Sequence, residues 1–265
     1  MVLNGLLIFK LKIFGKNIKS GSMKNMKVVY LTKAEIEREI ANVFIEKVKE
    51  NPSCVLGLAT GSSPLGIYKN LIEACKNGEV SFKDVTTFNL DEYLGLDGNH
   101  DQSYRYFMNH NLFNHIDINK ENTHVPSGFV TSDVEAALYD EKIGLKGGID
   151  IQLLGLGSDG HIAFNEPGTP FDSLTHIAEL TEQTISDNAR FFESIDDVPT
   201  KACTMGLKSI MNAKKIVLIA LGKSKKEAVD KLVNGEVDIN WPCTILQNHP
   251  DVTIYVDSDL MVAAL

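Results

Sequence analysis

Apolar and polar positions follow two alternating patterns along the chain from Met26 onward. Short, mostly apolar runs predict buried strands, and several of the segments between them repeat apolar residues at helical spacing. The predicted strands cover residues 27–31, 55–60, 85–90, 149–157, 215–221 and 252–256. Strands that alternate with helices are typical of βαβ units. The sequence therefore predicts an α/β fold with a doubly wound, mostly parallel sheet and helices on both faces.

Capping residues mark the start of the first two predicted helices. Thr32 and Glu35 match a capping box, in which a hydroxyl and a carboxylate satisfy free amides at a helix start. One apolar face follows, formed by Ile36, Ile40, Val43, Phe44 and Val48. In the second helix, Ser63 is the expected N-cap residue and Pro64 the expected first helical residue.

The patterned elements form one predicted unit. No Pro/Ser-rich linker, internal repeat or low-complexity tract divides the chain, so we expect a single α/β domain over residues 26–265. We expect residues 1–25 to be a loosely ordered N-terminal extension. Lys10 and Lys12 interrupt its apolar run before a signal-peptide core of roughly 7–15 residues forms. No later run approaches the ~20 apolar residues of a membrane span, so we expect no membrane partner.

Charge and cysteine content narrow the class of protein further. The chain has 26 Lys and Arg against 35 Asp and Glu, a formal net charge of -9. This balance opposes binding to a phosphate backbone, so we expect no nucleic-acid partner. The cysteines form no C-x-x-C pair and have no histidine partners at metal-site spacing. We therefore expect reduced thiols and a cytoplasmic protein.

Four loops with unusual residues each follow the end of a predicted strand. They are Gly61–Pro64, Asp91–Tyr93, Ser158–Pro167 and Gly222–Lys226. Parallel α/β sheets bind ligands beyond the carboxyl ends of their strands, so all four loops are expected at one edge.

Two of these loops have features of an anion site. Gly61, Ser62 and Ser63 lie between a strand and a helix, where backbone amides and hydroxyls can bind a phosphate. Neither a Walker A nor a dinucleotide fingerprint is present, which favours a small phosphorylated molecule and predicts no cofactor. Lys225 lies in the Gly222–Lys226 turn, whose cations could meet a phosphate, although a solvated basic helix start is the more common arrangement. Arg190, between polar and aromatic residues, is either a bidentate phosphate ligand or a surface arginine.

The segment from Asp159 to Glu166 is the strongest indication of catalysis. It places Asp159, His161 and Glu166 directly after a buried strand, where a carboxylate could fix the histidine tautomer and raise its basicity. Asp91, beside Glu92, is a second candidate for proton transfer, with a pKa raised by burial or by its acidic neighbour. A metal site is not predicted, because no second histidine lies near and no H-x-x-x-H spacing occurs.

Together these motifs resemble the glucosamine-6-phosphate deaminase, or isomerase, family. The matching runs are residues 58–64 (LATGSSP), 81–83 (SFK), 88–93 (FNLDEY), 157–167 (GSDGHIAFNEP), 188–192 (NARFF) and 221–225 (LGKSK). The resemblance covers roughly Met26 to Asp259. It implies a sheet of the phosphosugar-isomerase type, and conversion of glucosamine 6-phosphate and water to fructose 6-phosphate and ammonia in amino-sugar catabolism.

The resemblance also assigns roles to individual residues. His161 would assist opening of the pyranose ring, with Asp159 and Glu166 holding and tuning it. Asp91 would be the base that moves a proton from C2 to C1 of the open chain. The 6-phosphate would be held by Arg190, Lys225 and the loop of Gly61, Ser62 and Ser63.

The resemblance further implies a lid over the site at about residues 165–190. Some family members are hexamers activated by N-acetylglucosamine 6-phosphate through basic residues in this segment and a longer C-terminal tail. This chain has His176 and Ala178 at positions that are basic in those members, and it ends at Leu265. We therefore expect no such activation, while a monomer and a homo-oligomer both stay open. Two alternatives are a 6-phosphogluconolactonase-like hydrolase and a non-catalytic sugar-phosphate sensor.

Overall fold

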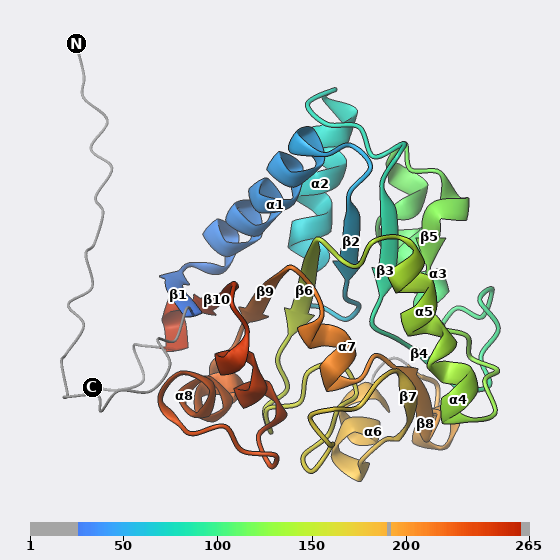
Figure 1. The fold of residues 1–265 in the computed structure, drawn as a ribbon, viewed down its shortest axis with the longest axis vertical. Coiled ribbons are helices and arrows are strands. Elements are labelled where there is room, and N and C mark those ends of the chain that lie inside the picture. Colours follow the sequence, from blue (N-terminus) through green and yellow to red (C-terminus); the bar gives the residue numbers. More distant parts are fainter. Residues whose placement is uncertain (1–25, 190–191, 261–265) are drawn as a thin grey trace.

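A seven-stranded sheet runs through the structure, a computed structural model that describes residues 26–189 and 192–260 (Figure 1). Its strands lie in the order β1-β10-β9-β6-β2-β3-β5, and each neighbouring pair is parallel. The strands are β1 (Met26–Leu31), β2 (Val55–Leu58), β3 (Thr86–Asn89), β5 (Thr123–His124), β6 (Ile151–Gly155), β9 (Lys215–Ala220) and β10 (Val252–Asp257). The predicted parallel α/β sheet is confirmed.

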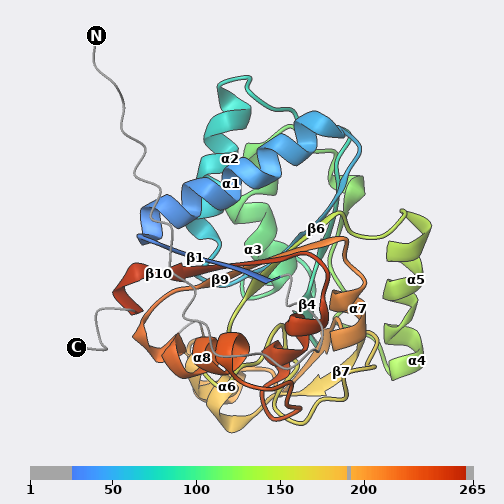
Figure 2. The same cartoon turned by 60° about the vertical axis from the view of Figure 1, so that its left-hand side comes forward.

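Helices cover both faces of this sheet, as the pattern predicts. Figure 2 shows α1 and α2 on one face and α7 and α8 on the other. The helices are α1 (Lys33–Glu50), α2 (Leu65–Lys76), α3 (Tyr104–Asn111), α4 (Asp133–Ala136), α5 (Leu138–Leu145), α6 (Glu182–Asn188), α7 (Leu207–Met211) and α8 (Lys226–Asn234). The predicted α1 face is buried at Ile36, Ile40, Phe44 and Val48, so this helix contributes directly to the core.

The predicted N-cap is confirmed for α1 but not for α2. The capping box of α1 forms, with the Glu35 carboxylate accepting from the Thr32 amide at 2.9 Å. For α2 the prediction is wrong, because Pro64 is the N-cap residue and the helix begins at Leu65. Pro64 already has helical backbone angles, so the turn that contains Ser63 ends one residue later than the capping preference indicates.

A second, smaller sheet was not predicted. It consists of β4 (Asp91–Tyr93), β8 (Lys201–Thr204) and β7 (His176–Glu179), paired antiparallel in that order. The sequence pattern predicts Asp91–Tyr93 at the carboxyl end of the third parallel strand. In the structure the chain leaves the large sheet after Asn89, and Asp91–Tyr93 pairs with a segment more than a hundred residues later. A small apolar cluster packs around this sheet, formed by Tyr93, Phe164, Ala178, Leu180 and Ala202.

The expected N-terminal extension at residues 1–25 lies outside the described residues. Within residues 26–189 and 192–260, no helix is long and apolar enough to cross a bilayer. All four cysteines are free thiols, and three of them are buried.

Gly206, the N-cap residue of α7, lies directly against the backbone of Ser173 and Leu174. A Cβ atom there would overlap the backbone carbonyl oxygens of Ser173 and Leu174. We predict that Gly206→Ala lowers the free energy of unfolding by about 1–3 kcal/mol, because backbone on both sides must shift. Urea denaturation measures this change.

Gly144→Ala is the matched control. Gly144 lies in α5, is exposed, and has no atom within 4 Å of an added Cβ. The same substitution there should raise the free energy of unfolding by roughly 0.5–1 kcal/mol, as alanine does inside helices. An unchanged Gly206→Ala variant would contradict the close packing described.

Candidate active site

The four loops singled out in the sequence follow four adjacent strands of the large sheet. The order β9-β6-β2-β3 brings Gly222–Lys226, Ser158–Pro167, Gly61–Pro64 and Asp91–Tyr93 to the carboxyl edge in turn. Strand β2 has β3 on one side and β6, a much later strand, on the other. The chain thus reverses its direction of progress across the sheet between β2 and β6, where parallel α/β folds place their ligands.

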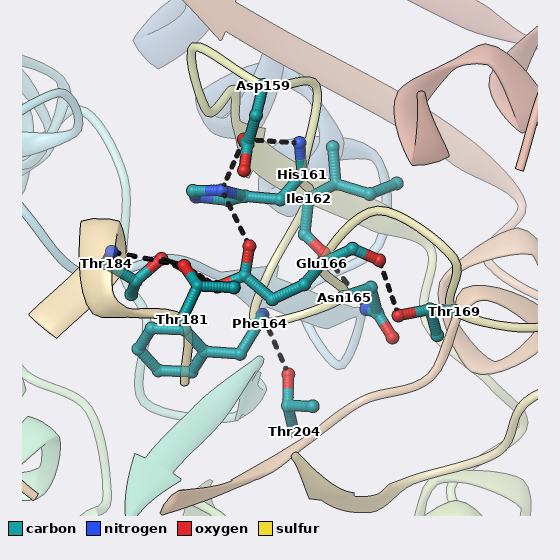
Figure 3. Close-up of polar contacts among 10 residues, drawn as sticks. All are labelled: Asp159, His161, Ile162, Phe164, Asn165, Glu166, Thr169, Thr181, Thr184 and Thr204. Carbon is teal, nitrogen blue, oxygen red and sulfur yellow. Dashed lines mark hydrogen bonds and ion pairs between the residues drawn. The ribbon is translucent and has the colours of Figure 1, made fainter. Parts of the chain in front are cut away.

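Asp159, His161 and Glu166 form the core of the loop after β6 (Figure 3). An oxygen of Asp159 lies 2.7 Å from Nδ1 of His161, and Oε2 of Glu166 lies 3.6 Å from the same nitrogen. Burial opposes ionisation of Asp159, but its contacts with His161 outweigh that effect and hold the pKa of Asp159 well below its usual range. Both carboxylates therefore face one ring nitrogen, and Nε2 is left for another partner.

The backbone of this loop is shaped to receive the histidine ring. A Cβ atom on Gly157 would overlap the His161 imidazole, so a glycine is required there. Ala163 has a φ of 52°, a left-handed conformation that costs a non-glycine residue on the order of 1 kcal/mol. The buried Asn165 fixes the loop, because its Nδ2 donates to the carbonyls of Ile162 at 2.9 Å and Met205 at 2.8 Å.

Asp91 is a buried carboxyl at the start of β4, with 6% of its surface exposed. Burial, with the adjacent Glu92 carboxylate as the second cause, raises the pKa of Asp91 from 3.8 to about 8. A carboxyl with such a pKa can exchange protons near neutral pH. Burial and an acidic neighbour are the two causes that the sequence analysis gives for a raised pKa of Asp91.

Glu92 has a structural task that the sequence did not indicate. Its carboxylate accepts hydrogen bonds from the backbone amides of Tyr93 at 2.9 Å, Tyr104 at 2.9 Å and Arg105 at 3.0 Å. Two of these amides belong to the first turn of α3, where free N–H groups favour a negative charge. Glu92 is 3% exposed, and this burial raises the pKa of its carboxyl while the three amide hydrogen bonds oppose that shift. These hydrogen bonds anchor α3 beside Asp91.

Thr204, also unpredicted, connects the two acid–base positions. It pairs with Asp91 across the small sheet, and its hydroxyl accepts a hydrogen bond from the Phe164 amide at 3.1 Å. Phe164 lies between His161 and Glu166 in the loop shown in Figure 3. Aromatic rings pack between the two positions. The ring centroids of Tyr93 and Tyr104 lie 4.7 Å apart, and the Phe164 ring stacks on Tyr104 with the centroids 6.2 Å apart.

The predicted phosphate ligands lie at the same edge of the sheet but are less enclosed. Gly61 has a φ of 86° and Ser62 is exposed, in the turn that leads into α2. Lys225 ends a short 3-10 turn immediately before α8. Arg190 lies outside the described residues. The structure thus brings Gly61, Ser62, Ser63 and Lys225 to the loops that flank the Asp159–Glu166 segment.

Asp159, His161 and Glu166 could also hold a divalent cation. One ligand atom from each lies within 4.8 Å of the others. The set contains one imidazole and two carboxylates, which are common metal ligands.

The raised pKa of Asp91 makes a prediction about stability. A group with a higher pKa in the folded than in the unfolded chain stabilises the fold fully below its unfolded pKa. That contribution disappears as the pH rises through the folded value, so it is lost here between about pH 4 and about pH 8. Asp91→Asn should remove this loss and exceed the wild type in stability by on the order of 4 kcal/mol at pH 7.

Urea denaturation at pH 5, 6, 7 and 8 measures the difference, which should grow with pH. Asp84→Asn, at an exposed aspartate, is the matched control and should show little pH-dependent difference. An Asp91→Asn difference that is constant over this range would contradict the buried, neutral carboxyl.

Comparison with known proteins places the chain in a family. The family model described as glucosamine-6-phosphate isomerases/6-phosphogluconolactonase matches residues 31–255. A glucosamine-6-phosphate deaminase of Thermoanaerobacter pseudethanolicus is 52% identical over 233 residues, which are 88% of this chain and 92% of that protein. A glucosamine-6-phosphate deaminase of Clostridium perfringens is 54% identical over 226 residues, which are 85% of this chain and 93% of that protein.

Solved structures agree with this assignment. A monomeric glucosamine-6-phosphate deaminase superposes with a TM-score of 0.87 at 43% identity, covering 89% of this chain and 99% of that one. A 6-phosphogluconolactonase from Trypanosoma cruzi has a TM-score of 0.69 at 21% identity, over 90% and 96% of the two chains, and shares the fold. The chain belongs to the family of glucosamine-6-phosphate isomerases and 6-phosphogluconolactonases.

Proposed function

We propose that this protein converts glucosamine 6-phosphate and water to fructose 6-phosphate and ammonia. The observation that carries the proposal is the presence of two separate proton-transfer positions beyond the ends of β3 and β6, the strands on either side of β2. They are the buried Asp91 carboxyl and the Asp159–His161–Glu166 group. Aldose–ketose isomerisation needs two such positions, one to open the ring and one to move a carbon-bound proton. Relatives at 52% and 54% identity carry the name of this activity.

His161 opens the pyranose ring in this mechanism. With Nδ1 facing Asp159 at 2.7 Å, Nε2 takes the proton of the anomeric hydroxyl and returns it to the ring oxygen as the C1–O5 bond breaks. The imidazolium that forms in between is stabilised by the carboxylates of Asp159 and Glu166. The result is the open-chain aldehyde form of the substrate.

Asp91 then acts on the open chain. Its carboxylate removes the proton from C2 while the ammonium group of the substrate supplies a proton to O1, which gives an enolamine. The protonated Asp91 then delivers its proton to C1. The resulting imine at C2 adds water and releases ammonia, which leaves the ketone of fructose 6-phosphate. A carboxyl with a pKa of about 8 is suited to both halves of this transfer, because it gains and loses a proton near neutral pH.

The phosphate group is proposed to lie at the loops that border these residues. The turn of Gly61, Ser62 and Ser63 leads into the twelve-residue helix α2 and offers backbone amides and two serine hydroxyls. The start of a helix favours anions. Lys225 and Arg190 supply the positive charge. The phosphate then anchors one end of the sugar while C1 and C2 reach the acid–base residues.

We further propose a single catalytic domain over residues 26–265, in which the segment at about 165–190 acts as a lid. We propose a monomer, which is the state named for the deaminase structure that is 43% identical to this chain. The free thiols favour a cytoplasmic location. We propose no activation by N-acetylglucosamine 6-phosphate, since His176 and Ala178 of β7 supply no permanent positive charge.

The test is an assay of the purified protein with glucosamine 6-phosphate, in EDTA and without nucleotide, in which ammonia and fructose 6-phosphate are measured together. Equal amounts of the two products are expected, with the same rate when N-acetylglucosamine 6-phosphate is added. A parallel assay with 6-phosphogluconolactone tests the lactonase alternative. Lactone hydrolysis without ammonia release would overturn the proposal, and turnover of neither compound would favour a sensor.

Asp91→Asn tests the role of the base within the same assay. We predict a loss of kcat of at least about 10²–10⁴-fold, the usual contribution of a positioned acid–base group, with substrate affinity little changed. Isothermal titration with the inactive variant gives the affinity. Full turnover by this variant would remove Asp91 from the mechanism.

A further inference from the structure

Glu166 is held by two separate parts of the chain. Its Oε1 accepts a hydrogen bond from the hydroxyl of Thr184 at 2.6 Å, and the hydroxyl of Thr181 lies 3.4 Å from the same oxygen. Its other oxygen, Oε2, lies 3.6 Å from Nδ1 of His161 (Figure 3). The carboxylate therefore bridges the helix α6 segment and the histidine.

Thr184 is the stronger of the two threonine contacts. It is 5% exposed, and its short hydrogen bond to a carboxylate belongs to the strong, charge-assisted class. Thr181 is exposed and serves mainly as the N-cap of α6, because its hydroxyl accepts from the Thr184 amide at 3.2 Å. The N-cap thus fixes the turn from which the Thr184 side chain reaches Glu166.

The hydrogen bond from Thr184 determines where the second oxygen of Glu166 points. A carboxylate can rotate about its last side-chain bond unless one oxygen is fixed. Glu166 is 9% exposed, and Oε2 is a buried atom without a hydrogen-bond partner among the described residues. With Oε1 fixed by Thr184, this unpaired oxygen is directed at His161, where it can stabilise a developing imidazolium.

We propose that Thr184 is a positioning residue for ring opening, which acts by holding the Glu166 carboxylate in place against His161. The inference rests on the proposed function, because ring opening is the step that His161 performs there. It adds a physical link between the α6 segment and the carboxylate oxygen that faces His161.

Three substitutions separate this role from a general effect on the fold. Thr184→Val removes the hydroxyl and keeps the shape, whereas Thr184→Ser keeps the hydroxyl. Thr175→Val is the matched control, since Thr175 is also buried but its hydroxyl has no hydrogen-bond partner among the described residues. Removal of an unpaired hydroxyl leaves no partner unsatisfied, so Thr175→Val should retain activity.

We expect Thr184→Val to lower kcat by about 10-fold to 100-fold, the range for loss of a hydrogen bond to a charged group. Thr184→Ser should stay within about threefold of the wild type, because the donor is retained. The reduced analogue, glucosamine 6-phosphate with C1 as an alcohol, is always open-chain and needs no ring opening. Its affinity should therefore be unchanged in both variants. A loss of affinity for the analogue in Thr184→Val would indicate a damaged pocket and overturn the proposal.

An isotope effect identifies the step that is slowed. With substrate deuterated at C2, slower ring opening masks the cleavage of the C2–H bond, so the isotope effect on kcat/KM of Thr184→Val should fall toward 1. An isotope effect larger than that of the wild type would mean that the Asp91 step is affected instead, and would contradict the proposal. Equal kcat values for Thr184→Val and the wild type would also overturn it.

The wild-type assay keeps this test separate from that of the proposed function. If the wild type releases no ammonia from glucosamine 6-phosphate, the proposed reaction fails and the role of Thr184 fails with it. If the wild type is active and Thr184→Val is equally active, the proposed reaction stands and only the positioning role is lost.

Discussion

The end of strand β8 is the point on which both acid–base positions depend. The backbone of Thr204 pairs with Asp91, and its hydroxyl accepts the amide of Phe164 in the His161 loop. At the next residue, Met205 donates its amide to Leu90 and accepts from Asn165. A displacement of this short segment would move both positions together. Two groups that must act in turn on neighbouring carbons of one sugar thereby keep a fixed relation to each other.

Burial gives the two positions different electrostatic properties. Asp91 is enclosed beside the Glu92 carboxyl, which is itself held by the amides of α3, and the neutral form of Asp91 is favoured. Asp159 is partly exposed and contacts His161, so its ionised form is favoured. One fold thus presents a carboxyl that readily holds a proton and a carboxylate that supports a protonated ring. The proposed reaction uses Asp91 to take up and return a proton and Asp159 to support the protonated ring.

The parallel sheet and its edge loops could be predicted because their signals are local. Each strand is a short apolar run, and the polar run Asp159–Glu166 follows one of them directly. The small sheet could not be predicted in this way, because β4 is three residues long and pairs with β8 more than a hundred residues away. Thr204 and Thr184 were missed for the same reason, since a buried threonine has no sequence signature until the chain brings its partner near. Glu92 was noticed as an acidic neighbour, but its task of holding α3 depends on a bend in the chain after Asn89.

The central claim is that one fixed carboxyl, Asp91, transfers the proton between C2 and C1. The most direct measurement is the position of deuterium in fructose 6-phosphate formed in D₂O, read at the two C1 hydrogens by NMR. A base fixed on one face of the enolamine predicts that deuterium, where it enters, occupies a single C1 position. Substrate deuterated at C2 and converted in H₂O should place any retained label at that same position. Equal labelling of both C1 positions would mean that solvent delivers the proton, and would contradict the account.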